Sequence, residues 1–487
     1  MSIYQIDAGP GTGKTFTSVT AGKIISEGRR FPANTTKEQE TIYKVLSQEL
    51  PKTRKIAYFA HTNTNKEQIK ARLPNDSKVY TFHGAGYGQL IRMYGRQELT
   101  KNRLDGFISQ ITGQTANRLP YDELRAWSGC KKITTYLKVE WLEPTDDNLA
   151  YLKVKYPDLS LIYIPKDWRS RVEDLLSRSA VPNKKVDYAD QVWLAAKRLT
   201  RPVYDIGIVD ESQDIGGATY QLVNRMCRHI VFCGDPNQAI NAFAGADEGM
   251  FQKIIELSSA IFPLKTTFRL PPNLITRANR IIPNSVLPGP NKIPGEELNI
   301  GYSNFVKRLS ELEPKHTLTM SRTNAPLITL ALTLSLKGVP VKLADKDLAG
   351  RLQGQLKSIG INDKTFHSRE RLLDEYLARI TKRDNPLLLM AAEDYCECIR
   401  QLSSGCNTYA ELQGQIKDIC SVKDNCDYHL FSTVHKAKGL EADNCFILNP
   451  PIEHPLANQN PIGMQQETNV RFVAETRSKA NQYYVVP

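Results

Sequence analysis

A glycine-rich segment at the start of the chain constrains the fold more than any other feature. Residues 3–6, IYQI, are typical of a short β-strand, residues 8–15 read AGPGTGKT, and residues 16–25 resemble a helix. A strand, a glycine-rich loop and a helix in this order are typical of a phosphate-binding loop, because backbone N–H groups and the helix N-terminus both favour an anion. The segment therefore predicts an α/β protein that binds a nucleotide.

Individual positions of this loop have separate expected roles. Gly11 and Gly13 let backbone N–H groups turn inward around phosphate oxygens. Lys14 is expected to reach the β- and γ-phosphates, and Thr15 to hold Mg²⁺. The first position carries Ala8 where the strict pattern has glycine. The predicted nucleotide-binding residues are Ala8, Gly9, Pro10, Gly11, Thr12, Gly13, Lys14 and Thr15.

Two further strands end in polar residues suited to ATP hydrolysis. The β-rich run at residues 204–209 leads into Asp210 and Glu211. Asp210 is expected to bind Mg²⁺, and Glu211 to accept a proton from the attacking water. The strand predicted at residues 229–233 is followed by Gln238, whose amide can hydrogen-bond a γ-phosphate or that water. ATP and Mg²⁺ are thus the predicted cofactors.

The order of ten segments resembles the UvrD/Rep-like DNA helicases of superfamily 1, as a compact member of the 3′-to-5′ branch, superfamily 1A. Residues 433–441, TVHKAKGLE, resemble the form of motif V found in that branch and lack the Ser-Gln-Gly of the opposite one. In chain order the ten segments are residues 8–15, 61–73, 81–84, 186–199, 210–214, 234–247, 266–282, 318–327, 432–448 and 469–480.

The resemblance implies an α/β fold with two RecA-like P-loop NTPase domains, each a parallel sheet flanked by helices, and two mainly helical insertions. The first domain is expected at residues 1–94 and 186–262, with its insertion at 95–185. The second is expected at residues 263–344 and 426–487, with a reduced insertion at 345–425. Residues 449–466 are predicted to be a loop.

The resemblance also implies roles for residues outside the phosphate loop. Arg269 and Arg477 would neutralise the transferring phosphate across an interdomain cleft. Phe268 would stack on adenine, while Gly439 and Glu441 would contact the nucleotide, Glu441 at its ribose. The implied single-strand contacts are Thr62, Asn63, Phe82, His83, Phe243, Arg322, Asn324 and His435.

Some of these positions have plainer explanations, and others depart from the family pattern. Phe243 is the best stacking candidate, and an ordinary core phenylalanine is its alternative. His83 and His435 are equally compatible with ordinary core or surface histidines. Glu475 stands where the family usually has a small or apolar residue, and it is expected to weaken coupling between ATP and DNA.

Charge and hydropathy set the expected partners. Lys and Arg number 64 against 52 Asp and Glu, a mild excess of +12 that is compatible with a polyanion. The longest apolar stretch, residues 323–336, is shorter than the roughly 20 residues of a membrane span. No secretory signal pattern is visible at the N-terminus, so a cytoplasmic protein is expected. Expected partners are single-stranded DNA, single-strand–duplex junctions and possible replication, repair or nuclease proteins, without a membrane.

Several alternatives stay open. Residues 95–185 mix basic and aromatic residues, which suits a strand-binding domain or a helical bundle with an aromatic core. The five cysteines between Cys396 and Cys426 could hold a metal or be ordinary thiols. The function could be a 3′-to-5′ translocating helicase or a DNA-sensing ATPase switch that regulates a partner. An unrelated P-loop ATPase or kinase is a more distant alternative.

Overall fold

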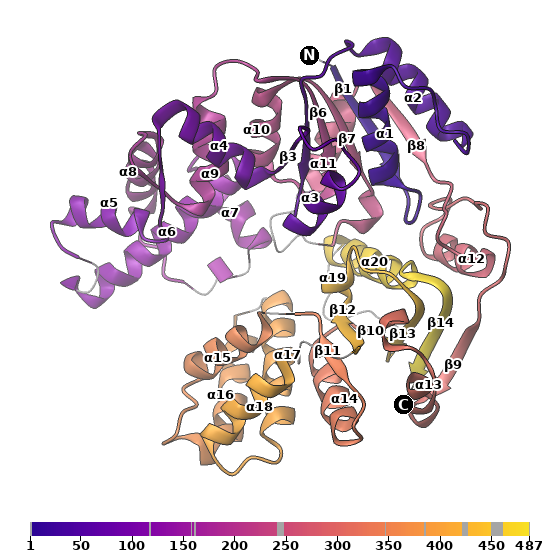
Figure 1. The fold of residues 1–487 in the computed structure, drawn as a ribbon. Helices are drawn as coiled ribbons and strands as arrows, with labels where there is room; N and C mark the ends of the chain where they lie inside the picture. Colours follow the sequence, from indigo (N-terminus) through magenta and orange to yellow (C-terminus); the bar gives the residue numbers. More distant parts are fainter. Residues whose placement is uncertain are drawn as a thin grey trace. The chain divides into compact units, whose positions relative to one another are not determined.

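The computed structural model describes residues 2–115, 118–156, 158–159, 162–240, 248–345, 347–383, 386–420, 427–449 and 461–486. The chain divides into two compact units, Met1–Thr266 and Thr267–Pro487, and Figure 1 traces both from indigo to yellow. Each unit contains its own six-stranded sheet.

The first unit is built on a parallel sheet in the order β3-β2-β6-β7-β1-β8. Its strands are β1 (Ser2–Ala8), β2 (Ile56–Ala60), β3 (Lys78–Thr81), β6 (Tyr204–Asp210), β7 (Cys227–Gly234) and β8 (Ala260–Leu264). Every pairing is parallel, so the carboxyl ends of all six strands meet at one edge. All five residues of β2 are buried, as expected for a parallel sheet covered on both faces.

Helices cover both faces of this sheet, with alternate strand residues facing opposite cores. Tyr58 packs in one core with α1 (Lys14–Glu27), α2 (Lys37–Glu49) and α3 (Asn63–Lys70). Phe59, its neighbour in β2, packs in the other with α4 (Phe82–Tyr94), α9 (Tyr188–Arg198), α10 (Gly217–Met226) and α11 (Glu248–Leu257). This two-residue period is that of a strand buried on both sides.

Four more helices form a separate group beside α4 and α9 (Figure 1). They are α5 (Arg103–Thr112), α6 (Tyr121–Glu140), α7 (Asp146–Lys155) and α8 (Trp168–Ala180). The short strands β4 (Glu98–Leu99) and β5 (Lys185–Val186) pair where the chain enters and leaves the group. Trp127, Tyr156 and Trp168 lie in its core, so aromatic residues here do build a helical bundle.

A buried ion network joins this helical group to α9. Lys138 lies 2.8 Å from Asp190 and 3.1 Å from Asp187, and Arg103 also contacts Asp190. The side chains of Lys138 and Asp190 are fully buried. Removing one partner would leave a buried charge unpaired, which typically costs about 3–5 kcal/mol. The network therefore fixes the group against the sheet-bearing part of the unit.

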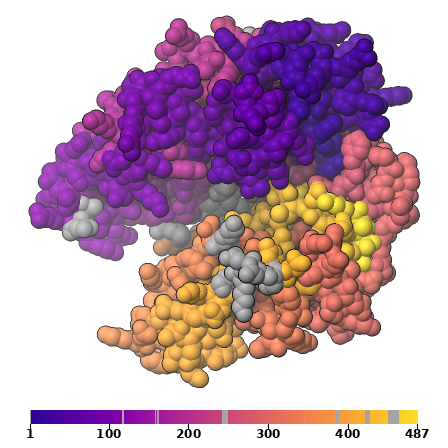
Figure 2. All heavy atoms as spheres, viewed as in Figure 1, coloured from indigo at the N-terminus to yellow at the C-terminus, as the bar shows by residue number. Residues whose placement is uncertain are grey.

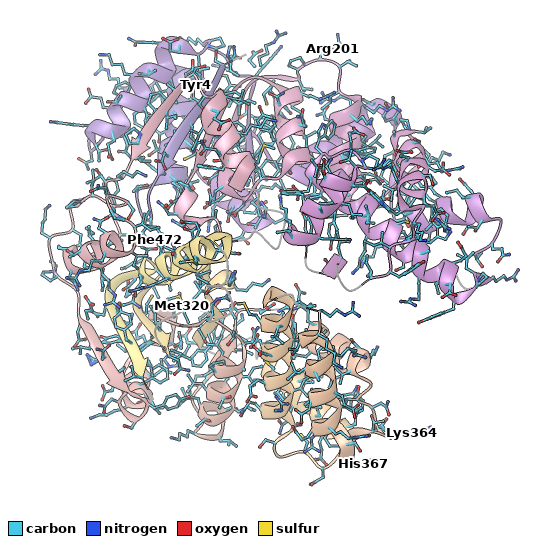
Figure 3. The ribbon with its side chains drawn as sticks, turned by 180° about the vertical axis from the view of Figure 1, so that it is seen from behind. Tyr4, Arg201, Met320, Lys364, His367 and Phe472 are labelled. Carbon is cyan, nitrogen blue, oxygen red and sulfur yellow. The ribbon has the colours of Figure 1, made fainter. Side chains whose placement is uncertain are left out.

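The second unit repeats the parallel plan in the order β11-β12-β10-β13-β14-β9. Its strands are β9 (Glu297–Gly301), β10 (Thr317–Ser321), β11 (Val341–Leu343), β12 (His429–Thr433), β13 (Ala442–Leu448) and β14 (Ser478–Val486). Its helices include α12 (Pro272–Ile281), α13 (Tyr302–Glu311), α14 (Ala325–Leu336), α19 (Val434–Ala437) and α20 (Pro461–Glu475). Figure 3 labels the buried Met320 of β10 and Phe472 of α20, with Tyr4 of β1 as their counterpart in the first unit.

Between β11 and β12 the chain forms a second helical group, drawn in orange in Figure 2. It contains α15 (Leu348–Ile359), α16 (Arg369–Thr381), α17 (Pro386–Ser403) and α18 (Tyr409–Cys420). Lys364 and His367, on the connection between α15 and α16, mark its outer end (Figure 3). The Asp394 carboxylate of α17 accepts hydrogen bonds from the backbone N–H groups of Asn324 and Ala325, so it caps α14. Short 3₁₀ turns in the described residues include η3 (Ser212–Asp214), η4 (Pro236–Gln238), η6 (Pro314–His316) and η7 (Phe366–Ser368).

The predicted α/β fold class, with parallel sheets flanked by helices, is confirmed. The prediction of a loop over residues 449–466 is wrong in its last part, because α20 begins at Pro461. Proline suits the first turn of a helix, and the buried Val470, Phe472 and Val473 hold α20 on the core. The division into four domain segments remains a prediction.

Two further expectations concern cysteines and membranes. The eight described cysteines are free thiols, and Cys426 lies outside the described residues. Within the described ranges no group of three or more His, Cys, Asp or Glu side chains could hold a metal ion. No helix in the same part of the chain has both the length and the apolar character needed to cross a membrane.

Candidate active site

The glycine-rich loop leaves β1 at Ala8 and turns directly into α1. Gly11 and Gly13 have φ of 70° and 77°, the left-handed region that glycine enters without a steric penalty. The Thr12 hydroxyl donates to the Gly9 carbonyl at 2.9 Å, and the Gly9 N–H donates to the Leu264 carbonyl of β8 at 2.8 Å. The helix has no side-chain cap at its start. Its first-turn N–H groups are therefore suited to an anion.

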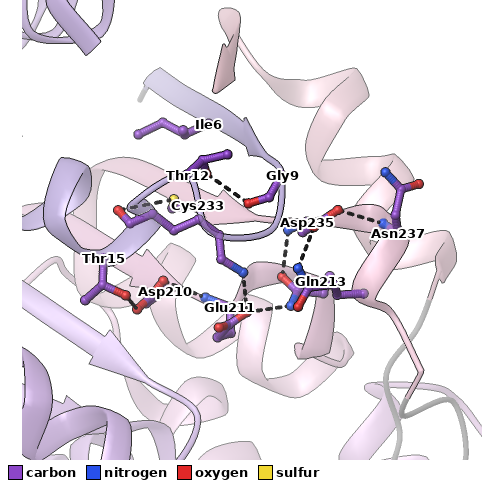
Figure 4. A network of polar contacts seen from close by, with 12 residues as sticks. Ile6, Gly9, Thr12, Thr15, Asp210, Glu211, Gln213, Cys233, Asp235 and Asn237 are labelled. Atoms are coloured by element: carbon purple, nitrogen blue, oxygen red, sulfur yellow. Dashed lines mark hydrogen bonds and ion pairs between the residues drawn. The ribbon is translucent and has the colours of Figure 1, made fainter. Parts of the chain in front are cut away.

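The last two residues of the loop, Lys14 and Thr15, contact two carboxylates: Asp210, the last residue of β6, and Glu211, which follows it (Figure 4). Lys14 Nζ lies 2.9 Å from Glu211 Oε2, and the Thr15 hydroxyl donates to Asp210 Oδ2 at 2.7 Å. Glu211 has a φ of 55°, which is uncommon for a residue other than glycine and typical of strained positions at functional sites. The structure thus brings together four predicted residues that are about 195 positions apart in the chain.

Burial and charge shift the ionisation of this cluster. Burial raises the pKa of Asp210 to about 6, with a further rise from the neighbouring Glu211 and opposition from Lys14. Burial also raises the pKa of Asp235. Burial alone would lower the pKa of Lys14, but the carboxylates of Glu211, Asp235 and Asp210 raise it above its ordinary value. Two buried carboxylates, Asp210 and Asp235, and the partly buried Glu211 give this cluster an excess of negative charge over Lys14, which favours an additional cation.

The oxygen donors of Thr15 and Asp210 fit Mg²⁺. This ion prefers hydroxyl, carboxylate and phosphate oxygens, and it is usually bound by one or two carboxylates together with substrate phosphates. The Thr15 hydroxyl and the Asp210 carboxylate adjoin the phosphate-binding loop and supply such a set. A cluster of three or more protein ligands is not required for an ion held in this way.

A relay of amides extends the network beyond the predicted residues. Gln213 Nε2 donates to Glu211 Oε2 at 2.6 Å, and Gln213 Oε1 accepts from the Asp235 N–H at 3.0 Å. Gln238 Nε2 donates in turn to Asp235 Oδ2 at 2.7 Å. Sequence reasoning singled out Gln238 but missed Gln213 and Asp235. Their positions just after β6 and β7 were the available signal, because polar residues after adjacent parallel strands share an edge.

In the second unit, Arg269 and Glu441 form an ion pair. Arg269 also donates to the Thr476 carbonyl at 3.1 Å, and Lys479 lies 2.8 Å from Glu441. Burial would raise the pKa of Glu441, but Arg269 and Lys479 together lower it. The adjacent Phe268 is 42% exposed, so a ring face is accessible for stacking. Gly439, also exposed, has a φ of 84°.

Arg477 lies inside the second unit with 2% of its surface exposed. Its Nε donates to the Val473 carbonyl at 2.9 Å and its Nη2 to the Thr476 hydroxyl at 3.2 Å. The nearby Glu475 is also buried, pairs with Arg277 at 2.9 Å and accepts from the Tyr484 hydroxyl. The unusual Glu475 is thus satisfied by local partners, and the role of Arg477 at ATP remains a prediction.

The predicted strand contacts of the first unit lie where β2 and β3 end. Thr62 and Asn63 are exposed at the start of α3, and the Thr62 hydroxyl accepts from the Asn65 N–H at 3.1 Å. The His83 ring stacks on Tyr188 with centroids 3.8 Å apart, and burial lowers the pKa of His83 to about 4. The Phe82 ring is 4% exposed and stacks on Phe59 in the core, so it has little surface to offer a base.

The predicted strand contacts of the second unit have intramolecular partners. Arg322 donates to both carboxylate oxygens of Glu467 at 2.6–3.2 Å, and the Asn324 side chain donates to Asp394 at 2.8 Å. Burial, and then the charge of Arg322, lower the pKa of His435 to about 3. Phe243 lies outside the described residues.

Comparisons with known proteins place these observations in a family. The AAA domain family matches residues 1–244. The F-box DNA helicase protein 1 of Schizosaccharomyces pombe is 24% identical over 471 residues, covering 87% of this chain and 52% of that protein. The F-box DNA helicase 1 of Gallus gallus is 25% identical over 321 residues, covering 59% of this chain and 30% of that protein.

The RecBCD enzyme subunit RecB of Escherichia coli is 32% identical over 116 residues, which is 22% of this chain and 9% of that protein. The chain spans about half the length of the Schizosaccharomyces pombe relative and a smaller share of the other two. The match to the AAA domain family includes the phosphate loop, Asp210, Glu211 and Gln238.

Proposed function

The chain belongs to the UvrD/Rep-like superfamily 1 helicases, and on this premise we propose that it is an ATP-driven DNA motor. In this proposal it moves 3′ to 5′ along single-stranded DNA and unwinds the duplex ahead of it. The single observation that carries the proposal is the network joining Lys14 and Thr15 to Glu211 and Asp210. Such a network serves the positioning and charge neutralisation on which phosphoryl transfer depends.

The proposed chemistry follows from exchanges of hydrogen bonds within this network. Lys14 leaves Glu211 to bind the β- and γ-phosphates, which frees the Glu211 carboxylate to accept a proton from the attacking water. Gln213 keeps Glu211 oriented through its 2.6 Å hydrogen bond. Thr15 and Asp210 hold Mg²⁺, which neutralises charge on the phosphate oxygens when it is bound.

The amide relay offers a route by which nucleotide state reaches other parts of the first unit. Glu211 is connected through Gln213 to Asp235, and Asp235 to Gln238. When Lys14 leaves Glu211 for a phosphate, Glu211, the first residue in this series of hydrogen bonds, loses its ion-pair partner. We propose that Gln238 senses this change, and that Arg269 and Arg477 add positive charge to the transferring phosphate.

A DNA-sensing ATPase switch is the second candidate. It is favoured by the intramolecular partners of Arg322 and Asn324, which bind Glu467 and Asp394. In a switch, a bound strand would take over Arg322 and Asn324 and release Asp394 from the start of α14. The signal would then reach a replication, repair or nuclease protein partner without processive unwinding.

ATP hydrolysis measured with and without single-stranded DNA tests the shared part of both candidates. Strong stimulation by DNA is expected for the parent protein and its loss for Glu211→Gln, because the amide cannot accept the water proton. Glu27→Gln, at the far end of α1, serves as the matched control. Turnover that is indifferent to DNA, with phosphate delivered to an acceptor, would instead indicate an unrelated P-loop ATPase or kinase.

Tailed duplexes separate the motor from the switch. Strand release only from a substrate with a 3′ single-stranded tail supports the 3′-to-5′ motor. Stimulated hydrolysis without strand release from either tail supports the switch. Release only from the 5′-tailed substrate would contradict the proposed polarity.

A further inference from the structure

Six exposed cations lie along the amino edge of the first sheet, opposite the edge that carries the candidate active site. Every strand pairing in this sheet is parallel, so the segments that enter its strands share one edge. The neighbouring strands β3, β2, β6 and β7 each carry at least one of these cations at or just before their first residues. We call this row the basic edge, and its members are Lys52, Arg54, Lys55, Lys78, Arg201 and Arg228.

Hydrogen bonds and strand register place the members of the basic edge side by side. The Lys55 carbonyl accepts from the Asp205 N–H at 3.0 Å, so β2 and β6 begin together. Lys78 is the register partner of Ala57 in β2, and Arg228 lies 3.7 Å from Asp205. With neighbouring strands about 4.8 Å apart, four strands give a row about 14 Å long.

Few carboxylates offset the charge of the basic edge. Arg228 is the only one of the six cations with an ion-pair partner in the part of the chain that the structure describes. That partner, Asp205, also accepts from the Thr53 hydroxyl at 2.7 Å. Residues 50–55, 71–77 and 199–203, which lead into β2, β3 and β6, contain a single acidic residue, Asp76. Arg201 lies on the last of these connections (Figure 3). The row therefore keeps a net positive charge.

The basic edge lacks the groups that a single strand or a protein partner would need. The three connections contain no aromatic residue, so they offer no ring on which an unpaired base can stack. Tyr204, the first residue of β6, is buried, and its hydroxyl bonds to that of Tyr80 at 2.7 Å. Protein partners are usually held by aromatic or apolar anchors, whereas the leucines and the valine of the connections are all at least partly buried. A row of cations without rings or anchors fits a regular polyanion.

We propose that the basic edge binds the phosphate backbone of duplex DNA. A duplex carries one negative charge per about 1.7 Å of its axis, so a row about 14 Å long spans about eight of its phosphates. Contacts limited to phosphates carry no sequence information, so binding is independent of sequence. The inference rests on the proposed function, which makes DNA the polyanion that the protein meets, and it adds a second DNA segment to the strand held at the carboxyl edge.

The two edges of the first sheet are far enough apart to bind DNA separately. The seven residues of β6 span about 23 Å, at roughly 3.3 Å per residue. Charges at this distance are largely screened, because the Debye length at physiological salt is about 8 Å. Asp210 and Glu211 make the other end of β6 acidic, which keeps a duplex away from the phosphate loop. One molecule would thus hold a duplex and a single strand together.

A double variant, Lys78→Glu with Arg201→Glu, tests the basic edge. Both residues are exposed and have no ion-pair partner among the described residues, so the variant should fold. The matched control is Lys44→Glu with Lys307→Glu, which reverses two exposed lysines of α2 and α13 outside the row. The probe is a fluorescein-labelled blunt duplex of about 20 base pairs, about 68 Å long and without a single-stranded tail. Its anisotropy is followed without nucleotide, before and after unlabelled oligothymidylate saturates the protein.

The parent protein should bind the duplex with and without oligothymidylate. The double variant should bind the duplex about ten- to hundredfold more weakly, and the slope of log affinity against log salt should fall by about 2, one for each lost phosphate contact. Its affinity for labelled oligothymidylate should stay within about twofold of the parent value. The control should change either affinity by less than about twofold, because isolated surface charges are screened.

Three results would overturn the proposal: no duplex binding by the parent protein, undiminished binding by the double variant, or an equal loss in the control. Polyglutamate that competes as well as DNA of equal charge would assign the basic edge to an acidic protein and would also overturn it. Duplex binding that depends on Lys78 and Arg201, in a protein that does not bind oligothymidylate, would support the basic edge and count against the proposed motor.

Discussion

The two sheets have the same number of strands and the same parallel direction, yet they carry their candidate site residues on different edges. In the first sheet, Lys14 and Gln238 follow β1 and β7, and Asp210 is the last residue of β6. Thr62 and His83 follow β2 and β3. All of these residues therefore lie along the carboxyl edge. The nucleotide candidates occupy one half of this edge and the strand candidates the other half.

The second sheet divides the same two tasks between its opposite edges. Glu441 and Arg477 immediately precede β13 and β14, at the amino edge. Arg322 and His435 follow β10 and β12, at the carboxyl edge. A strand of the length of β10 spans about 16 Å, at roughly 3.3 Å per residue. Nucleotide and strand contacts in the second unit should consequently respond to mutation independently.

The largest expected effect tests the amino edge of the second sheet. Arg269→Ala should lower DNA-stimulated ATP turnover by about 10³-fold, because an arginine that stabilises the transferring phosphate contributes about 10³–10⁵ in rate. Glu441 keeps Lys479 as a partner at 2.8 Å, so the variant should still fold. Steady-state hydrolysis measures turnover, and anisotropy without nucleotide measures strand affinity.

Arg308→Ala is the control for this prediction, because Arg308 pairs with Glu296 on another part of the same unit. Its turnover should stay within about twofold of the parent protein, as for most surface substitutions. If Arg269→Ala loses strand affinity as much as turnover, the two edges do not act separately.

The next effect tests the nucleotide half of the carboxyl edge in the first sheet. Lys14→Ala should lower turnover by about 10²–10³-fold, the usual result of removing one group that stabilises developing charge. Lys23→Ala, farther along α1, is the matched control. Hydrolysis assays at saturating DNA would show the difference. Near-parental turnover in Lys14→Ala would contradict the assignment of the phosphate loop.

Those parts of the fold and site that depend on local pattern could be predicted from the sequence. The loop before α1 and the carboxylates after β6 were identified because glycine spacing and an apolar strand are local signals. The direct contact of Lys14 with Glu211 was not predicted; it arises because β1 and β6 are parallel strands of one sheet and end at a common edge. The strand order of the sheet, which the sequence does not give, brings the ends of β1 and β6 close together.

The rest depended on packing between segments far apart in the chain. Phe82 follows β3 in a position suited to a strand contact, but Phe59 of β2 draws its ring into the core. Arg477 donates hydrogen bonds to a carbonyl and a hydroxyl group at the end of α20. Gln213 accepts a hydrogen bond from the Asp235 N–H only because β6 pairs with β7. Such partners are chosen by tertiary contacts, which local periodicity does not encode.

A smaller expected effect, on the pH dependence of stability, tests whether water is excluded from the amino edge of the second sheet. His429, the first residue of β12, is buried and lies 2.8 Å from the Thr317 hydroxyl at the start of β10. Burial lowers its pKa from 6.5 to about 4. The unfolded chain therefore binds a proton first as pH falls, so the stabilisation is complete above pH 6.5 and is lost toward pH 4.

Near pH 5 the protonation of His429 in the unfolded chain should lower the free energy of unfolding by about 2 kcal/mol relative to neutral pH. His429→Gln cannot titrate and should not show this part of the acid sensitivity. Urea unfolding of parent and variant at neutral pH and at about pH 5 measures the difference. Equal acid sensitivity of the two proteins would mean that water reaches this edge.

The smallest effect separates strand contact from stability in the other half of the carboxyl edge of the first sheet. Asn63 is exposed in the first turn of α3, which has no acidic residue there. Asn63→Asp places a negative charge at the helix N-terminus, which should stabilise the helix by about 0.3–1 kcal/mol. The same charge should repel DNA phosphates and weaken single-strand affinity by about three- to tenfold.

Gln68→Glu adds an equal charge to an exposed position later in the same helix and is the matched control. Thermal unfolding and oligothymidylate anisotropy, measured on the same preparations, give the two readouts. A stability gain accompanied by a selective loss of affinity in Asn63→Asp would place the strand beside the start of α3. Equal losses in both variants would show only general repulsion between the added charge and DNA. The strand would then have to contact another part of this edge, and the His83–Tyr188 stack would be the next position to test.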